Sequence, residues 1–179
     1  EFDMVPKLSK LYNKEMLHLT DLPYKKSDID AIFISHSHSD HIRHLDFLDE
    51  EIPVYLGHGT HKITEIYHKL FPSLFNIGEH KNIHLFKTGD KIKIKHLIIE
   101  PIHVEHSIPG AYGFIIHTSK GPIVYTGDFR IHGPRADMSQ EFVDKARRAK
   151  PLALLCEGTR IGREEYRNFT EEEVEKEVS

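Results

Sequence analysis

Short apolar segments alternate with stretches rich in charge, glycine and proline along most of the chain, and this pattern predicts strands and helices in alternation. Residues 31–34 are all apolar and have polar neighbours on both sides, which is typical of a short buried strand. Residues 91–95 alternate strictly between lysine and isoleucine, as in a strand with one buried face. Residues 113–118 and 122–125 flank a loop that contains Gly121, and this arrangement predicts a β-hairpin. Further strands are expected at residues 53–56, 83–86, 97–104 and 151–156.

Apolar residues at helical spacing predict helices between these strands. One face of a helix over residues 60–70 would carry Ile63, Ile66, Tyr67 and Leu70. Thr60 is suited to cap its start, and Pro72 follows its end. Further helical patterns cover residues 42–49, residues 140–150 and the segment from residue 171, which Thr170 could cap. The order of elements favours an α/β fold.

The composition is that of an ordinary globular chain. With 179 residues, 39% of them hydrophobic, it can build one substantial core. The formal net charge of −4 shows no basic excess, so composition alone gives no support for a nucleic-acid partner. No stretch is long and apolar enough to predict a signal peptide or a membrane span. The single cysteine, Cys156, excludes an internal disulfide and fits the reducing cytoplasm; we expect it to be buried in its apolar run.

Residues 35–41 carry the most informative chemistry, because Ser-His-Ser-His-Ser-Asp-His follows the predicted strand directly. On extended backbone His36 and His38 point the same way, so both can bind one ion. Asp40 and His41 follow where the chain turns and can face a second ion. Imidazole and carboxylate ligands suit zinc, and also iron or manganese. A solvated histidine-rich loop is the alternative, and this spacing after a buried strand disfavours it.

The motif resembles the His-x-His-x-Asp-His signature of the metallo-β-lactamase superfamily. The resemblance implies an αβ/βα sandwich with a site for two Zn²⁺ ions at one edge, Mn²⁺ or Fe²⁺ being alternatives. It also implies a further histidine ligand and an aspartate that bridges the metals, which correspond to His106 and Asp128. His103 is the rival of His106 and is expected to be packed or to support a ligand. Asp128 could instead only cap a turn after Gly127.

Glu157 narrows the resemblance. An acidic residue at a strand end is ambiguous by itself. Together with His-Ser-Ile-Pro from His106 and Thr-Gly-Asp ending at Asp128, however, it resembles the β-CASP branch, which includes RNase J-type ribonucleases and enzymes of mRNA 3′-end processing. The resemblance implies hydrolysis of phosphodiester bonds, most of all in single-stranded RNA, with Asp40, Asp128 and Glu157 as catalytic residues. It leaves open exonuclease or endonuclease action and a homodimer.

Parts of the branch pattern are absent. Residues 163–179 contain no histidine, although members of this branch have two later histidine motifs. The first strands of the sandwich also have no counterpart before residue 31. We therefore expect a partial sandwich, with an incomplete metallo-β-lactamase domain over residues 1–157 and the truncated start of an inserted β-CASP-like domain over residues 158–179. We expect that this fragment alone lacks full activity.

Other functions use the same ligands. A superfamily hydrolase of small esters, thioesters or lactones is the main alternative. A non-catalytic RNA-processing scaffold is a weaker one, because such subunits lose metal ligands and all six expected ligands are present in this sequence. A redox di-iron site is disfavoured, since that branch resembles His-x-Glu-x-Asp and position 38 is histidine. His132 could be a substrate contact or an ordinary loop histidine, and Arg130 and Arg135 could hold an anionic group.

The other histidines are expected to have no role as ligands; they are His18, His44, His58, His61, His68, His80, His84, His96 and His117.

Overall fold

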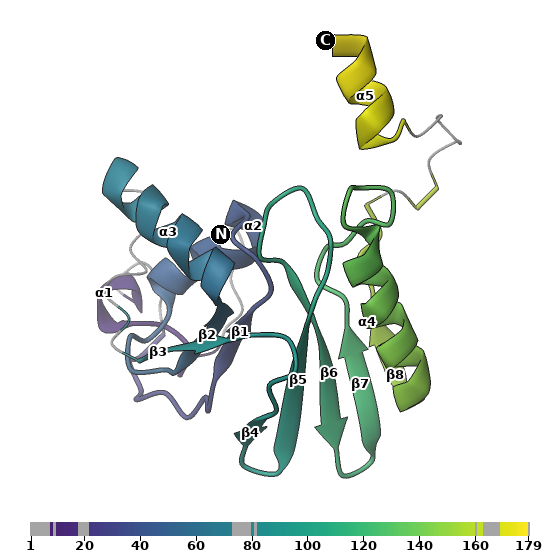
Figure 1. Ribbon diagram of the computed structural model, residues 1–179. Helices are drawn as coiled ribbons and strands as arrows, with labels where there is room; N and C mark the ends of the chain where they lie inside the picture. The colour runs from purple at the N-terminus through teal and green to yellow at the C-terminus, as the bar shows by residue number, and fades with distance from the viewer. Residues whose placement is uncertain are drawn as a thin grey trace. The chain divides into compact units, whose positions relative to one another are not determined.

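The chain forms two compact units in the computed structural model, Glu1–Leu85 and Phe86–Ser179 (Figure 1). The structure describes residues 8, 10–17, 22–72, 80, 82–159, 161–162 and 169–178. Both units combine strands with helices, so the α/β class is confirmed. Within these described ranges, no helix has the length and apolar character needed to cross a membrane.

A three-stranded sheet with the order β1-β2-β3 organises the first unit. Its strands are β1 (Ile32–Ile34), β2 (Val54–Gly57) and β3 (Ile83–Phe86), the last residue of which begins the second unit. β1 and β2 are parallel, with Ile34 opposite Leu56. The core of this unit consists of Ile34, Ile42, Leu45, Val54 and Leu56. Its helices are α1 (Lys14–Leu17), α2 (Ser39–Ile42), α3 (His58–Leu70) and a 3-10 helix (Arg43–Phe47).

The segment after β1 differs from the prediction. A single helix was expected over residues 42–49, but α2 already begins at Ser39 and continues as a 3-10 helix. Asp40 and His41 therefore lie on a helical turn. Leu45 is 2% exposed and Phe47 is 36% exposed, so the 3-10 turn buries only part of the expected apolar face.

Helix α3 also corrects two predictions. It starts at His58, with Gly57 preceding it, so Thr60 is not the cap but a buried residue of the first turn. The expected apolar face exists but is buried only in part, because Ile66 is 53% and Leu70 is 64% exposed. Thr64 instead faces the interior, where its hydroxyl donates to the carbonyl of Thr60 at 3.0 Å. A threonine that satisfies its hydroxyl within the helix can be buried, and a count of apolar residues overlooks this.

The second unit contains a five-stranded sheet with the order β4-β5-β6-β7-β8. The strands are β4 (Ile92–Ile94), β5 (Leu97–His103), β6 (Tyr112–Thr118), β7 (Gly121–Tyr125) and β8 (Ala153–Leu155). Neighbours from β4 to β7 are antiparallel, whereas β8 runs parallel to β7. Consequently the carboxyl ends of β5, β7 and β8 all lie at the same end of the sheet.

Helix α4 (Ala136–Ala149) lies against this sheet (Figure 1). Its Phe142 belongs to the core of this unit, together with Ile102, Ile115 and Val124 of the strands. A Cβ atom at Gly113 would lie 2.5 Å from the Phe142 ring, so only glycine allows this close packing. Helix α4 begins four residues earlier than predicted. Helix α5 (Glu171–Val178) begins as predicted: the Thr170 hydroxyl accepts from the Glu173 amide at 3.2 Å, and the Glu173 carboxylate accepts from the Thr170 amide at 2.8 Å.

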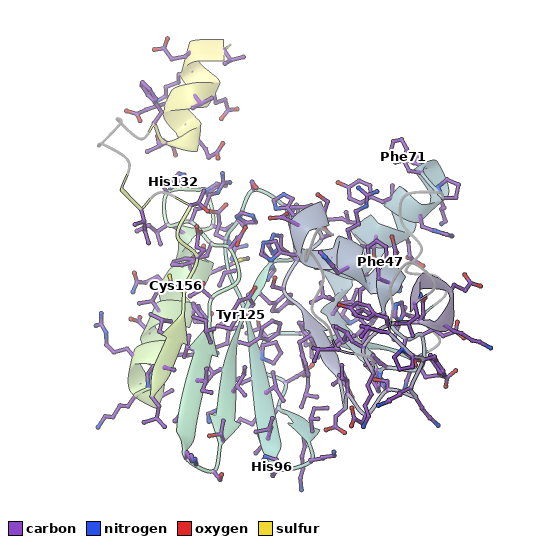
Figure 2. All side chains as sticks on the ribbon, turned by 180° about the vertical axis from the view of Figure 1, so that it is seen from behind. Phe47, Phe71, His96, Tyr125, His132 and Cys156 are labelled. Atoms are coloured by element: carbon purple, nitrogen blue, oxygen red, sulfur yellow. The ribbon has the colours of Figure 1, made fainter. Side chains whose placement is uncertain are left out.

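The expected burial of Cys156 is wrong, because the thiol is exposed. Figure 2 shows Cys156 just beyond β8. Leu154 is 61% and Leu155 is 54% exposed, so the whole strand is open to solvent. Among the described residues, β8 pairs only with β7 and forms the edge of the sheet. An apolar run predicts burial only when further elements cover it, and the sequence of the run does not show whether they do.

Candidate metal-binding residues

The histidine motif of the first unit begins where β1 ends. His38 has an extended backbone conformation, with φ −64° and ψ 145°, and precedes α2. His36 and His38 therefore point the same way, as predicted, and His36 Nε2 lies 3.1 Å from His38 Nδ1. His36 is fully buried, and the Ser35 hydroxyl lies 3.1 Å from its Nδ1. Contacts at both ring nitrogens fix the orientation of this imidazole.

Asp40 and His41 lie in the short helix α2. The ring centroids of His36 and His41 are 4.1 Å apart, so three imidazoles of the motif are gathered in one loop. Asp40 is different, since its side chain is 76% exposed and its Oδ2 lies 3.5 Å from His41 Nε2. The loop thus contains a cluster of three histidines, of which His36 is buried and His38 and His41 are half-buried, with the exposed Asp40 carboxylate beside them.

His106 and Asp128 come together in the second unit. His106 follows β5 and Asp128 follows β7, and the carboxyl ends of these strands lie at the same end of the sheet. His106 Nε2 lies 3.8 Å from Asp128 Oδ2, and the two side chains are 16% and 24% exposed. This distance is too long for a hydrogen bond. The sheet topology therefore brings together two residues that are 22 positions apart in the sequence.

Glu157 lies at the same end of the sheet as Asp128, because it follows β8 and β8 runs parallel to β7. The Thr126 hydroxyl accepts from the Glu157 amide at 3.2 Å, and Glu157 Oε1 accepts from the Phe129 amide at 3.2 Å. Burial by itself would raise the pKa of Glu157. Hydrogen bonds from Thr159 and from the Phe129 amide, together with the nearby charge of His106, hold the pKa below its ordinary value. Glu157 is therefore an ionised acceptor that supports the segment carrying Asp128.

Glu105 was not identified from the sequence, although it adjoins His106. Its carboxylate is 6% exposed and accepts from Arg130 Nε at 2.8 and 2.7 Å. The hydrogen bond to Glu105 is the main reason that the pKa of Arg130 is raised. The only sequence signal was an acidic residue directly after the apolar strand 97–104.

The anionic-group hypothesis for Arg130 and Arg135 finds no support in this geometry. Arg130 pairs with Glu105 and Glu171, and Arg135 forms a two-point bond with Asp137 at 2.9 Å for each contact. Both guanidinium groups already bind carboxylates.

The remaining histidines have ordinary environments where the structure describes them. His103 stacks on Tyr112 with ring centroids 4.7 Å apart, and burial, helped by the charge of Arg135, lowers its pKa. His80 is buried and donates from Nε2 to the Leu45 carbonyl at 2.9 Å. Figure 2 shows the exposed His132 beyond the carboxyl end of β7 and His96 at the opposite end of that sheet. His18 lies outside the described residues.

The spacing within each unit fits metal coordination. Two ligand atoms bound to one tetrahedral zinc ion stand about 3.4 Å apart. The separations of 3.1 Å between His36 and His38 and of 3.8 Å between His106 and Asp128 lie on either side of this value. By residue type, the His36–His38 pair and the His106–Asp128 pair could each provide ligands for a metal ion.

Comparison with known proteins identifies the family. A family model described as a beta-lactamase superfamily domain matches residues 2–167. Ribonuclease J of Sinorhizobium meliloti is 32% identical over 150 residues, which cover 80% of this chain and 26% of that protein. Ribonuclease J of Thermus thermophilus is 30% identical over 166 residues, covering 84% of this chain and 27% of that protein.

A solved structure shows the same similarity. The crystal structure of a protein of unknown function from Enterococcus faecalis V583 is 28% identical and covers 98% of this chain and 44% of that chain, with a TM-score of 0.76. The chain spans about a quarter of the length of the curated relatives named above. With the family model matching nearly its whole length, the chain belongs to the beta-lactamase superfamily and has the metallo-β-lactamase fold, in a form that is partial relative to its longer relatives.

Proposed function

We propose that this chain is part of a metal-dependent hydrolase that cleaves phosphodiester bonds in RNA. The observation that carries the proposal is the similarity to two proteins named Ribonuclease J, which extends over 80% and 84% of this chain. It is supported by the His-x-His-x-Asp-His motif at residues 36–41 and by the pairing of His106 with Asp128. Each unit thus contributes ligands whose spacing suits a metal ion.

The proposed metal centre uses ligands from both units. His36, His38 and His106 would hold one Zn²⁺, and Asp40 and His41 a second, with Asp128 bridging the two; Mn²⁺ or Fe²⁺ could take the same places. Two such ions, when bound, lower the pKa of a water molecule and offset the negative charge that develops on a phosphate group. This chemistry suits a phosphodiester, whose oxygens are anionic.

The protein groups have separate tasks in this proposal. The exposed carboxylate of Asp40 can accept a proton from the attacking water and orient it. Ser35 holds the ring of the buried His36 in place. Glu157, kept ionised by its hydrogen bonds, would be a catalytic residue or hold the segment of Asp128 in place.

Several finer features belong to the same proposal. They are the β-CASP assignment, with a domain boundary between Glu157 and Gly158, exonuclease action on single-stranded RNA, a homodimer, and a cytoplasmic location. The β-CASP assignment and the domain boundary follow from the resemblance described above, and exonuclease action and a homodimer are compatible with it.

Asp128→Asn in the full-length protein is the decisive test. Metal content by mass spectrometry should fall from about two ions per chain, and cleavage of end-labelled RNA should be lost, because an amide cannot bridge two cations as a carboxylate does. Asp137→Asn changes an exposed carboxylate outside the proposed site and serves as the matched control. Unchanged cleavage in Asp128→Asn would overturn the assignment.

A substrate screen separates the proposal from its main alternative. The full-length protein is offered a chromogenic phosphodiester, a thioester and a lactone under the same conditions. Turnover of the phosphodiester and of RNA supports the proposal. Turnover of the thioester or lactone alone would replace RNA by a small-molecule substrate with the same metal ligands.

A further inference from the structure

We propose that the buried Glu105–Arg130 pair is a positioning device for His106 and Asp128, and that metal affinity depends on this pair. The inference deepens the proposed function and rests on it, because it assumes that His106 and Asp128 bind metal. Glu105 directly precedes His106 in the sequence, and Arg130 follows Asp128 by two residues. The pair therefore links the two segments that carry these ligands.

Three hydrogen bonds make this link. Arg130 Nε donates to both carboxylate oxygens of Glu105 at 2.8 and 2.7 Å, and the Arg130 amide donates to the Glu105 carbonyl at 2.9 Å. His106 and Asp128 are only 3.8 Å apart, too far for a hydrogen bond to fix their separation. The neighbouring pair can therefore set the distance between the two ligands before a metal arrives.

Burial makes the pair sensitive to change. The Glu105 side chain is 6% exposed and that of Arg130 is 24% exposed, so neither charge can be left without its partner at low cost. The Glu105 amide is also held by the Ser139 hydroxyl at 3.0 Å, which anchors it to α4. At Gly133 a Cβ atom would overlap with the Glu105 carboxylate, so the loop after Arg130 closes tightly over the pair.

A second arginine–carboxylate pair provides a matched control. Arg135 contacts Asp137 at 2.9 Å through two nitrogens, yet these side chains are 57% and 65% exposed and only two residues apart. This pair joins no separate segments of the chain. Loss of a guanidinium contact by itself can thus be separated from loss of a link between two ligand segments.

The test is zinc affinity of the full-length protein, measured by competition with a chromophoric chelator. Glu105→Gln and Arg130→Gln should each weaken zinc binding by about 10- to 100-fold, the usual effect of losing a partner that orients a ligand. The double variant should be no weaker than either single one, because both remove the same link. kcat should fall while KM for RNA stays unchanged, and Arg135→Gln should match the wild type. Unchanged zinc affinity in a folded Glu105→Gln variant, or additive losses, would overturn the inference.

An apolar replacement keeps the test decisive if Glu105→Gln fails to fold. Glu105→Met combined with Arg130→Met removes both buried charges together, and such replacements are often neutral or stabilising. This variant should unfold at or above the wild-type temperature and still bind zinc about 10-fold or more weakly. Wild-type zinc affinity in the folded variant would contradict the positioning role.

Asp128→Asn distinguishes failure of this inference from failure of the proposed function. If Asp128→Asn leaves zinc binding unchanged, the proposed metal centre itself is wrong. If Asp128→Asn weakens binding but the Glu105 and Arg130 variants do not, the metal centre stands and only the positioning role is rejected.

Discussion

The two groups of candidate ligands are built in different ways. In the first unit, His36, His38 and His41 lie within one short loop, and contacts inside that loop hold them together. In the second unit, His106 and Asp128 follow different strands, and residues from further segments hold them in place. One group depends on local spacing, and the other depends on the fold.

This difference has a physical consequence. A local loop needs only an extended strand end and a helix start to gather its imidazoles, so it is robust to changes elsewhere. A site built from several strands depends on every contact that fixes their ends, including Glu105, Arg130 and Glu157. Substitutions far from the ligands should therefore affect the second group more than the first.

His36→Ala is expected to have the largest effect on zinc affinity, because His36 contacts both His38 and His41 of the first group. The ring is fully buried and contacts both Ser35 and His38. Zinc affinity of the full-length protein should fall by more than about 100-fold, since loss of a supporting partner alone costs about 10- to 100-fold. Competition with a chelator measures the change. His44→Ala, an exposed histidine just after the motif, should bind zinc normally; an equal loss in both variants would deny His36 a specific role.

The same difference explains what could be predicted from the sequence. The short distance between His36 and His38 agrees with the expectation that alternate side chains on extended backbone point the same way. Their role as metal ligands stays a prediction. The strands from β1 to β8 were also located to within a few residues, since each has an apolar or alternating run. Glu105 could not be identified, because its partner Arg130 is 25 residues away and only the sheet topology joins them.

Errors elsewhere have a related cause. Cys156 was predicted to be buried from its apolar neighbours, yet β8 is an exposed edge strand. Thr60 was predicted as a cap, yet α3 starts earlier and buries it. In both cases the local pattern was recognised correctly, and the tertiary surroundings decided the outcome.

Gly133→Ala tests the second group without replacing a ligand or a charged residue. A Cβ atom there would overlap with the Glu105 carboxylate, so the loop or the Glu105–Arg130 pair must shift. We expect a loss of about 1–3 kcal/mol in the free energy of unfolding, as for other overpacked sites, with weaker zinc binding. Urea denaturation of the metal-free protein measures the first effect. Gly158→Ala is the control, because its Cβ would meet only the exposed side chain of Ile161, with Cδ1 at 3.0 Å and Cγ1 at 3.7 Å. A similar loss of stability there would remove the special role of Gly133.

His103→Phe is expected to change pH dependence more than stability at neutral pH. Burial, with a contribution from Arg135, lowers the pKa of His103 below 6.5 in the folded protein. Between that lowered value and 6.5 the unfolded chain binds more protons, so stability falls as the pH falls through this window. Phenylalanine keeps the stacking on Tyr112 and should flatten this slope.

Urea denaturation of the metal-free protein at about pH 7.5 and about pH 5.5 measures the slope, since the window lies near the usual titration range of histidine. His96→Phe changes an exposed histidine at the other end of the same sheet and should leave the slope as it is. An unchanged slope in His103→Phe would assign the acid sensitivity to other groups.

Glu171→Gln should have the smallest effect and sharpens the comparison within a single arginine. Arg130 contacts Glu105 inside the protein and Glu171 on the surface. Arg130 Nη1 lies 2.6 Å from Glu171 Oε1, and the Glu171 side chain is 48% exposed. Surface ion pairs contribute roughly 0–1 kcal/mol, so stability and zinc affinity should stay close to wild type. If Glu171→Gln weakened zinc binding as much as Glu105→Gln, the charge of Arg130 rather than its buried link to Glu105 would govern the ligands. A difference between the two variants instead locates the control of His106 and Asp128 in the buried half of the Arg130 network.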